Sequence, residues 1–429
     1  MVDFSLAMKK RYDLLVIGNG IAGNSAIEGF RRYNREASIA LVTNDNEPLY
    51  SPCILPLYLS DEIKKKDLFL KGIEDYKRFG IEFLSNTKVY ALDPKNKLIY
   101  LEGKNNVKVE YSKLVIATGS KPLDLFRDKG LKDSIFTFKW FSDAFKLKRF
   151  KGEKIVVIGS GLIGIEVAIA LAKKGKSVTI IEALPHIMPL SFDKEAADKI
   201  SEILNKKGIK IIQNDKVLDL LIKNGNLKSV ITNKREISAD GVVIATGMVP
   251  EVSLAKDAGI ELGSTKSIKV DSNMRTNIED IYAAGDCIEI KDFLFDEPRR
   301  NLFWYFAKME GKVAGENCAG IKKEFFPLPQ IVSVDIFNTP VFSLGFTEEE
   351  MLRMNKKPKI FTNENKKGYL KLIYLDEKLV GVQIINRIKE IPQISFSLLR
   401  GTKKQELVIR RDIPFTFLPY SHLRRKLNS

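Results

Sequence analysis

Residues 12–23 read YDLLVIGNGIAG, an apolar run that ends in a glycine-rich turn. A helix is expected from Asn24 to about Tyr33, and a second apolar run, SIALV, occupies residues 38–42. The same layout recurs at residues 154–182, where KIVVI leads into GSGLIG, a helix is expected to about Lys173, and SVTIIE closes the repeat. Strand, glycine turn, helix and strand in this order are typical of a βαβ unit. The sequence therefore predicts an α/β fold with two Rossmann-like, three-layer domains.

Both turns have the spacing GxGxxG, which suits a bound pyrophosphate. The glycines are Gly18, Gly20 and Gly23 in the first turn, and Gly159, Gly161 and Gly164 in the second. Glycine lets backbone N–H groups approach the pyrophosphate, and the N-terminus of the following helix offsets its charge. Two such turns predict two nucleotide-binding sites.

The residue after the second strand of each repeat is expected to bind a ribose. Glu182 follows Gly159 by 23 residues, close to the spacing of about 20 that a ribose-binding acid has. A carboxylate repels a 2′-phosphate, and no arginine follows it, so we expect NADH rather than NADPH. In the first repeat either Asp45, or Thr43 and Asn44 through neutral hydrogen bonds, is expected to bind the ribose.

Composition narrows the class of protein. The chain has 429 residues with 44% apolar residues, which predicts two or three folded domains rather than disorder. Its three cysteines cannot form a dense disulfide framework, which favours a reducing compartment. No apolar run is long enough for a transmembrane helix and the start does not resemble a signal peptide, so we expect a cytoplasmic protein without a membrane partner.

The formal net charge of +16 admits several explanations. Nucleic acid, an acidic protein partner or an anionic substrate each fit a basic chain. A lysine-rich surface with interspersed glutamates is the simpler interpretation, because no basic run, residues 64–66 included, is longer than three. Nucleic-acid binding is therefore disfavoured.

Five ordered motifs carry a resemblance over nearly the whole chain. They are GNGIAG at 18–23, IATGSKP at 116–122, GSGLIGIE at 159–166, VIATGMVPE at 243–251 and IYAAGD at 281–286. The chain resembles the pyridine nucleotide–disulfide oxidoreductase family of flavoproteins. The resemblance implies FAD on the first glycine turn, NADH on the second, and hydride transfer from NADH to the flavin.

By the same resemblance, further residues are expected at the cofactors. Ala117, Thr118 and Gly119 would close over the flavin side, and Gly285 and Asp286 would hold the ribityl or pyrophosphate part of FAD. Glu166 and Gly247 would belong to the NAD site, with Glu166 near the nicotinamide.

The family's organisation implies four segments. Residues 1–120 and 241–325 would form the FAD-binding domain, and residues 121–240 the NAD-binding domain. Residues 326–429 would form an α+β C-terminal dimerisation domain, because VFSLGFTEEE at 341–350 and GYLKLIYLDEKLVGVQII at 368–385 are similar to that domain. The chain is then expected to be a homodimer.

Cys53 is the candidate catalytic residue. It lies in EPLYSPCILP, residues 47–56, where dithiol members of the family would carry CxxxxC. A single cysteine resembles the branch of coenzyme A-disulfide reductases, NADH oxidases and sulfur or polysulfide reductases. Pro52 and Pro56 suit a helix that begins near Cys53, and unpaired N–H groups at a helix start stabilise a thiolate. The predicted acceptor is a disulfide, a polysulfide or a related sulfur species.

Two alternatives remain. The segment YSPCILP also resembles that of rubredoxin and ferredoxin reductases, which use no cysteine there, so Cys53 would be a bystander and a small carrier protein the partner. A flavin-bearing protein with a basic nucleic-acid-binding surface is the other alternative.

The remaining cysteines and histidines have structural interpretations. Cys287 and Cys318 are expected to pack in the interior, and His186, in the loop ALPHIMP, is expected on the surface. His422 near the C-terminus is a weaker candidate for catalysis. Two histidines without a Cys/His cluster give no case for a metal site.

Overall fold

The computed structural model describes residues 11–102, 107–126 and 133–400. The chain divides into two compact units, each formed from separate segments. The first unit comprises Met1–Leu55, Ile63–Lys121 and Met248–Pro327; the second comprises Pro56–Glu62, Pro122–Gly247 and Leu328–Ser429. His422 lies outside the described residues.

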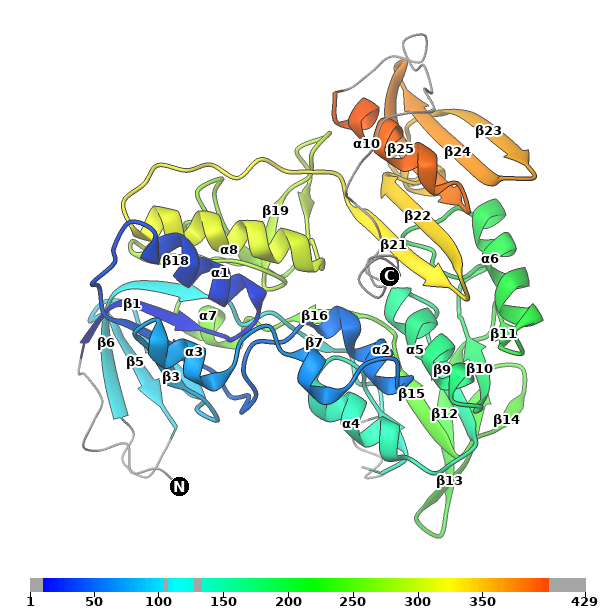
Figure 1. The fold of residues 1–429 in the computed structure, drawn as a ribbon, viewed down its shortest axis with the longest axis horizontal. Coiled ribbons are helices and arrows are strands. Elements are labelled where there is room, and N and C mark those ends of the chain that lie inside the picture. Colours follow the sequence, from blue (N-terminus) through cyan, green and yellow to red (C-terminus); the bar gives the residue numbers. More distant parts are fainter. Residues whose placement is uncertain (1–10, 103–106, 127–132, 401–429) are drawn as a thin grey trace, which may run out of the picture. The chain divides into compact units, whose positions relative to one another are not determined.

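The first unit is built on a mainly parallel sheet with strand order β3-β2-β1-β6-β5-β4 (Figure 1). Strand β18 pairs with residues 114–116 of β6, beyond the residues that pair with β5. The strands are β1 (Arg11–Ile17), β2 (Ile39–Val42), β3 (Ile81–Leu84), β4 (Val89–Asp93), β5 (Leu98–Leu101), β6 (Val107–Ile116) and β18 (Ile281–Ala283). All four residues of β2 are buried. Apolar runs of this kind are typical of parallel strands covered on both faces.

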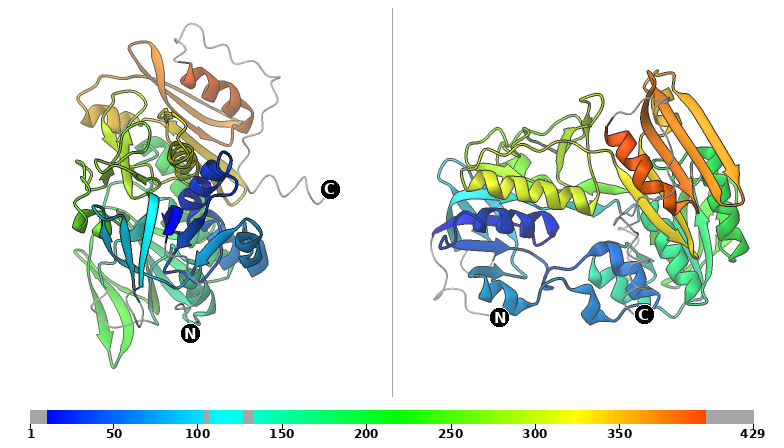
Figure 2. Two further views of the ribbon diagram at one scale, coloured as in Figure 1. Left: turned by 90° about the vertical axis from the view of Figure 1, so that its left-hand side faces the viewer. Right: turned by 45° about the horizontal axis from the view of Figure 1, so that its top comes forward.

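Two helices of the first unit, α1 (Ile21–Arg31) and α8 (Trp304–Cys318), lie side by side in all views (Figures 1 and 2). Glycines let their backbones touch: a Cβ on Gly311 would lie 2.1 Å from the carbonyl oxygen of Ala22. A Cβ on Gly315 would lie 1.9 Å from that of Ala26. This close packing ties the helix of the first glycine turn to a helix almost 300 residues later in the chain.

Smaller elements complete the first unit. They are η1 (Pro52–Ile54), η2 (Lys65–Leu68), α3 (Ile73–Arg78), β7 (Ser120–Pro122), which pairs with β16 (Met248–Pro250), α7 (Ser253–Asp257), β17 (Ile268–Lys269), β19 (Ile288–Lys291) and β20 (Pro298–Arg299). Helix α2 (Leu55–Leu59) continues η1 and leads into the second unit.

The second unit contains a parallel sheet with strand order β11-β10-β9-β15-β8. Its elements are β8 (Ile135–Phe136), α4 (Phe141–Arg149), β9 (Lys154–Ile158), α5 (Leu162–Lys173), β10 (Ser177–Ile181), α6 (Lys194–Lys206), β11 (Lys210–Ile212) and β15 (Gly241–Ile244). An antiparallel sheet of β12 (Val217–Lys223), β13 (Asn226–Thr232) and β14 (Glu236–Ser238) packs its apolar residues with those of β9 and β15.

The C-terminal part of the second unit is an antiparallel sheet of order β21-β22-β25-β24-β23. Its elements are β21 (Ile331–Ile336), β22 (Thr339–Gly345), α9 (Glu348–Arg353), β23 (Lys359–Asn365), β24 (Gly368–Leu375), β25 (Lys378–Ile385), η4 (Ile388–Glu390) and α10 (Ile391–Leu399). Figure 1 shows α10 beside this sheet.

The predicted fold class is confirmed: two Rossmann-like regions and an α+β C-terminal part are present. The first predicted helix begins at Ile21 rather than Asn24, because Gly20 is its N-cap and residues 21–23 of the glycine turn already form its first turn. No helix in the described ranges is long and apolar enough to span a membrane.

Candidate functional site

The first glycine turn joins β1 to α1 and has three distinct glycine positions. Gly18 has a φ of 112°, and a Cβ there would lie 2.1 Å from the carbonyl oxygen of Ala117. A Cβ on Gly23 would lie 2.1 Å from the carbonyl oxygen of Gly18. A Cβ on Gly20 would meet no atom within 4 Å. The outer two glycines therefore permit the turn itself, and the middle one keeps open the space that a pyrophosphate needs.

The second glycine turn repeats this arrangement between β9 and α5. Gly159 has a φ of 96°, and a Cβ there would lie 2.5 Å from the carbonyl oxygen of Ala245. A Cβ on Gly164 would lie 2.2 Å from the carbonyl oxygen of Gly159, and one on Gly161 would meet nothing within 4 Å. Both turns thus fit the phosphates of a dinucleotide.

The predicted flavin-side residues converge on the first turn within the first unit. The N–H of Ala284 donates to the carbonyl of Ile116, which places the segment of Gly285 and Asp286 beside that of Ala117. The hydroxyl of Ser120 donates to Asp286 Oδ2 at 2.6 Å. Three stretches that are far apart in sequence therefore meet where a dinucleotide would lie.

Thr118 and Gly119, which follow β6, are hydrogen-bonded to Glu251, which follows β16. The Thr118 hydroxyl donates to the carbonyl of Glu251 at 2.6 Å, and the N–H of Glu251 donates to the carbonyl of Gly119 at 2.9 Å. Gly119 has a φ of 70°, a conformation that favours glycine.

Glu310 on α8 was not among the predicted residues, yet it binds the segment of Gly285 and Asp286. Its Oε2 accepts a hydrogen bond of 2.9 Å from the N–H of Gly285, and the residue is 1% exposed. Burial raises the pKa of Glu310 to about 8, and the neighbouring Asp286 adds to the rise. A neutral carboxyl is therefore favoured there at neutral pH. A glutamate within the glycine-rich helix segment KMEGKVAG was the available signal in the sequence.

At the end of β2 the ribose-binding candidates have different environments. Thr43 is buried, and its hydroxyl accepts from the N–H of Asp45 at 3.2 Å. Asp45 Oδ1 accepts from the N–H of Glu47 at 3.1 Å, so this carboxylate shapes its own turn. Asn44 is exposed. All three follow β2 directly or within three residues, and Val42 at its end accepts from the N–H of Gly18 in the first turn at 2.8 Å.

At the end of β10, Glu182 is bonded into the second glycine turn. Its Oε2 accepts from the N–H of Ser160 at 2.9 Å and from the Ser160 hydroxyl at 2.6 Å. Its Oε1 accepts from the N–H of Leu184 at 2.9 Å. A carboxylate has about four acceptor positions, so these three bonds leave one on Oε1 for a ribose hydroxyl.

Glu166 and Gly247 complete the predicted NAD set. Glu166 lies on α5, two residues after Gly164, and burial of its carboxyl raises its pKa to about 8. Gly247 follows β15 with a φ of 126°, and a Cβ there would meet nothing within 4 Å.

Cys53 lies in η1, directly after Pro52, in the helical run that continues into α2. All three cysteines of the chain are within the described residues, none is in a disulfide, and Cys53 alone is exposed. Burial raises the pKa of Cys287 to about 11 and that of Cys318 further, so both are poor nucleophiles. Their predicted packing role fits this burial.

Lysines of the second unit hold the residues that follow Cys53. Lys148 on α4 and Lys174 after α5 both form ion pairs with Asp61, and Lys173 binds Glu62 at 2.8 Å. Lys148 also lies 4.1 Å from the ring centroid of Tyr58. Asp61 has a φ of 65°, and both lysines hold its pKa below the usual range. These contacts lie within the second unit and fix the residues that follow α2.

The predicted surface position of His186 is wrong. The residue is 3% exposed, and its Nε2 lies 2.9 Å from Glu349 Oε1 on α9. The bounding prolines suggested an open loop, but a partner 163 residues away covers it.

No cluster of three or more potential metal ligands occurs in the part of the chain that the structure describes.

Known proteins match along most of the chain. The sequence profile of the family described as pyridine nucleotide-disulphide oxidoreductase matches residues 12–311. A protein of Methanocaldococcus jannaschii named NADH oxidase is 31% identical over 428 residues, which cover 94% of each chain. The rubredoxin-NAD(+) reductase of Pseudomonas putida is 26% identical over 377 residues, 87% of this chain and 95% of that protein. The solved NAD-dependent persulfide reductase of A. fulgidus superposes with a TM-score of 0.88 at 26% identity, covering 94% of this chain and 79% of that one.

Proposed function

The chain belongs to the pyridine nucleotide-disulfide oxidoreductase family, and on that premise we propose that it passes electrons from NADH through FAD and Cys53 to a sulfur acceptor. Membership makes the chain an FAD-dependent NAD(P)H oxidoreductase. The acceptor class, the preference for NADH and the role of Cys53 are the proposal.

We assign FAD to the first glycine turn and NADH to the second. FAD supplies the two-electron chemistry, by taking a hydride from NADH and passing electrons onward. Gly20 and Gly161 leave room for the two pyrophosphates, and Asp286, oriented by Ser120, would bind the ribityl or pyrophosphate part of FAD. Glu182 would bind the adenosine ribose of NADH through the remaining acceptor position of Oε1. We assign the FAD-binding domain to residues 1–120 and 241–325, and the NAD-binding domain to residues 121–240.

The exposure of Cys53 is the observation that supports a sulfur species as the acceptor. It is exposed in a first helical turn, soon after the second strand of the FAD repeat, whereas the other two cysteines are buried. Its thiolate would attack one sulfur of a disulfide or polysulfide, so that a mixed disulfide forms and the other sulfur leaves as a thiolate. Two further electrons, supplied by NADH, reduce the mixed disulfide and restore the thiolate. The overall balance is NADH, one proton and RSSR giving NAD⁺ and two RSH.

The test is an NADH oxidation assay of wild type and Cys53→Ser with coenzyme A disulfide, polysulfide, oxygen, rubredoxin and a dye. We expect Cys53→Ser to lose disulfide and polysulfide reduction and to retain NADH-to-dye transfer. Equal loss of every activity would indicate a packing role for Cys53. Full retention of sulfur turnover would contradict the proposal.

A second candidate is reduction of a small electron carrier protein. The rubredoxin reductase relative and the net charge of +16, which would attract an acidic carrier, favour it. In that case rubredoxin reduction survives in Cys53→Ser and weakens as salt is raised.

We further propose a cytoplasmic homodimer that forms through residues 326–429. The exposed apolar side chains of Phe396 and Leu399 on α10 support an interface there. Sedimentation of the purified protein tests this assembly.

A further inference from the structure

We propose that Glu349 and Asp193 are positioning residues for coenzyme binding: contacts with the C-terminal sheet and α9 fix the loop 183–192, which follows Glu182 at the coenzyme site. The proposal rests on the assignment of Glu182 to the NADH ribose made above. It adds that affinity for NADH depends on a part of the chain that lacks a glycine fingerprint.

The loop 183–192 is in direct contact with the second glycine turn. The N–H of Met188 donates to the carbonyl of Ser160 at 3.0 Å, and the N–H of Leu184 donates to Glu182. Met188 has a φ of 50° and is 1% exposed, and Ile187 and Phe192 are fully buried. A shift of this loop would therefore displace both Ser160 and Glu182.

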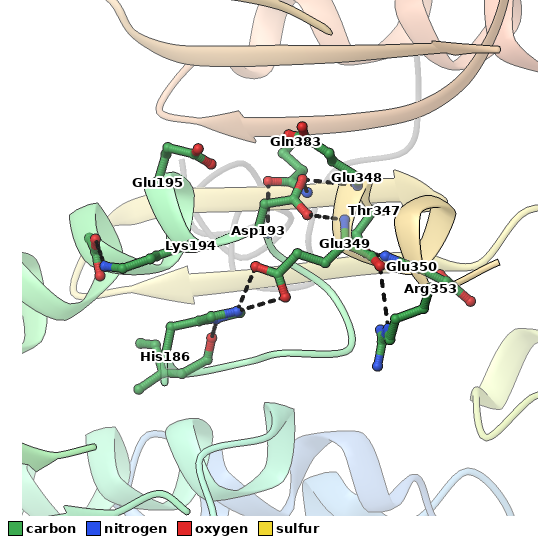
Figure 3. Close-up of polar contacts among 12 residues, drawn as sticks. His186, Asp193, Lys194, Glu195, Thr347, Glu348, Glu349, Glu350, Arg353 and Gln383 are labelled. Atoms are coloured by element: carbon green, nitrogen blue, oxygen red, sulfur yellow. Dashed lines mark hydrogen bonds and ion pairs between the residues drawn. The ribbon is translucent and has the colours of Figure 1, made fainter. Parts of the chain in front are cut away.

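The first anchor of the loop is His186, which Figure 3 shows facing Glu349. His186 Nδ1 lies 3.0 Å from the carbonyl oxygen of Ile187, and Nε2 lies 2.9 and 3.1 Å from the two oxygens of Glu349. Both ring nitrogens thus face acceptors, which fixes the ring orientation. Glu349 is at the start of α9, so the loop is held by an element of the C-terminal part.

The second anchor is Asp193, immediately after the loop (Figure 3). Its carboxylate is 2% exposed and accepts from the backbone N–H groups of Glu348 at 3.2 Å and Glu349 at 3.0 Å. It also accepts from Gln383 Nε2 on β25 at 2.7 Å. Asp193 is the N-cap residue of α6, yet its side chain is turned to the start of α9 instead.

A buried lysine on β24 neutralises this anchor. Lys371 is 1% exposed, and its Nζ lies 3.0 Å from Asp193, 3.1 Å from Glu195 and 2.6 Å from Glu348. Burial alone would lower the pKa of Lys371, but the bonds to Glu348 and Asp193 raise it overall, so the ammonium stays charged. Buried charges that are paired and fully hydrogen-bonded hold one arrangement, because any other leaves a charge unpaired. Both anchors meet the first turn of α9, which makes this turn the support of the loop.

Glu349 is the best residue to vary, because its side chain is 41% exposed and its loss leaves no buried charge on α9. Glu349→Ala removes the acceptor of His186. Glu349→Gln keeps an oxygen at the same place. Glu364→Ala is the matched control: Glu364 on β23 binds Lys199 on α6 at 2.6 Å and so also joins the C-terminal sheet to α6, through two residues outside the loop.

The experiment measures NADH dissociation constants by fluorescence titration, together with KM and kcat for NADH-to-dye transfer, FAD content and thermal unfolding. We expect Glu349→Ala to raise Kd and KM for NADH about tenfold, with kcat at saturating NADH, FAD content and unfolding temperature nearly unchanged. Glu349→Gln should recover most of the affinity, and Glu364→Ala should match wild type. Equal effects in Glu349→Ala and Glu364→Ala would overturn the proposal, since the cause would then be general loosening.

Glu182→Ala, measured in parallel, separates this proposal from the function on which it rests. Weaker NADH binding in Glu182→Ala but not in Glu349→Ala overturns the loop proposal and leaves the ribose assignment intact. Weaker binding in Glu349→Ala alone overturns the ribose assignment, and with it the proposed route from the loop through Glu182 to NADH. Unchanged binding in both overturns both.

Discussion

Gly18 and Gly159 begin their turns with φ of 112° and 96°, and in each turn the third glycine lies against the carbonyl oxygen of the first. The residues between the glycines differ. Ser160 donates twice to Glu182 at the end of β10, whereas Asn19 donates to the carbonyl of Glu47 and accepts from the Tyr76 hydroxyl at 2.7 Å. The glycine pattern thus gives the two turns the same backbone, and the residue between the first two glycines determines which groups surround each turn.

The largest expected effects come from filling the open centre of each turn. Gly20 and Gly161 have φ of −71° and −64°, which any residue adopts, and no atom lies within 4 Å of either added Cβ. Valine at either place should change the free energy of unfolding of the ligand-free protein by no more than about 1 kcal/mol. Gly20→Val should yield protein without FAD, and Gly161→Val should yield yellow protein that does not take up NADH. Absorbance and NADH titration check both, and normal flavin content in Gly20→Val would contradict the FAD assignment.

Glu310 accepts from the N–H of Gly285, in the segment that lies beside the first turn, and its effect on stability should depend on pH. The pKa of Glu310 is raised to about 8 in the folded state, compared with about 4.3 in the unfolded state. Below about pH 4.3 the carboxyl is protonated in both states, and its full contribution to stability is present. As pH rises toward 8, unfolding releases its proton, and stability falls by up to about 1.4 kcal/mol per pH unit. Urea unfolding of wild type and Glu310→Gln should show this slope reduced in the variant. Parallel pH profiles would contradict the buried neutral carboxyl.

Glu182 accepts two hydrogen bonds from Ser160 in the second turn, a contact that the described residues of the first turn lack. Its removal should weaken the discrimination between NADH and NADPH. Wild type should favour NADH over NADPH by about 1–3 kcal/mol, because a carboxylate opposes a 2′-phosphate. Glu182→Ala should narrow this gap. Comparison of kcat/KM for the two coenzymes measures it, and equal use of both by wild type would refute the interpretation of Glu182.

The smallest effect concerns the lysines that hold Asp61. Asparagine also tolerates the positive φ of this residue, so Asp61→Asn removes charge without changing the backbone. Because these groups are partly exposed, we expect a loss of about 0.5–1 kcal/mol in the free energy of unfolding at low salt. The loss should shrink in high salt. Urea unfolding at two salt concentrations measures it, and a salt-independent loss would point to backbone strain instead.

Local sequence patterns predicted those helices and strands that are determined by neighbouring residues in the sequence. Apolar runs and glycine spacing predicted β1, α1, β9 and α5, since periodicity and turn chemistry determine them. The meeting of Ala117, Asp286 and the first turn required the resemblance to a family, because Ala117 is 99 residues after Gly18, and Ser120 and Asp286 are 166 residues apart.

The polar network of the second unit could not be predicted from the sequence. His186 and Glu349 are 163 residues apart, and Lys371 and Glu195 are 176 apart. Nothing in the local sequence of either member distinguishes a buried partner from a solvated charge. Glu310 is similar, because only the approach of Gly285 gives its carboxyl a donor.

The chemistry of Cys53 is tested most directly by trapping its product. The protein is incubated with coenzyme A disulfide in the absence of NADH, and its intact mass is measured without reductant. We predict one coenzyme A adduct per chain, mapping to Cys53, released on addition of NADH and missing in Cys53→Ser. A chain that reduces coenzyme A disulfide with NADH yet never carries the adduct would contradict the account.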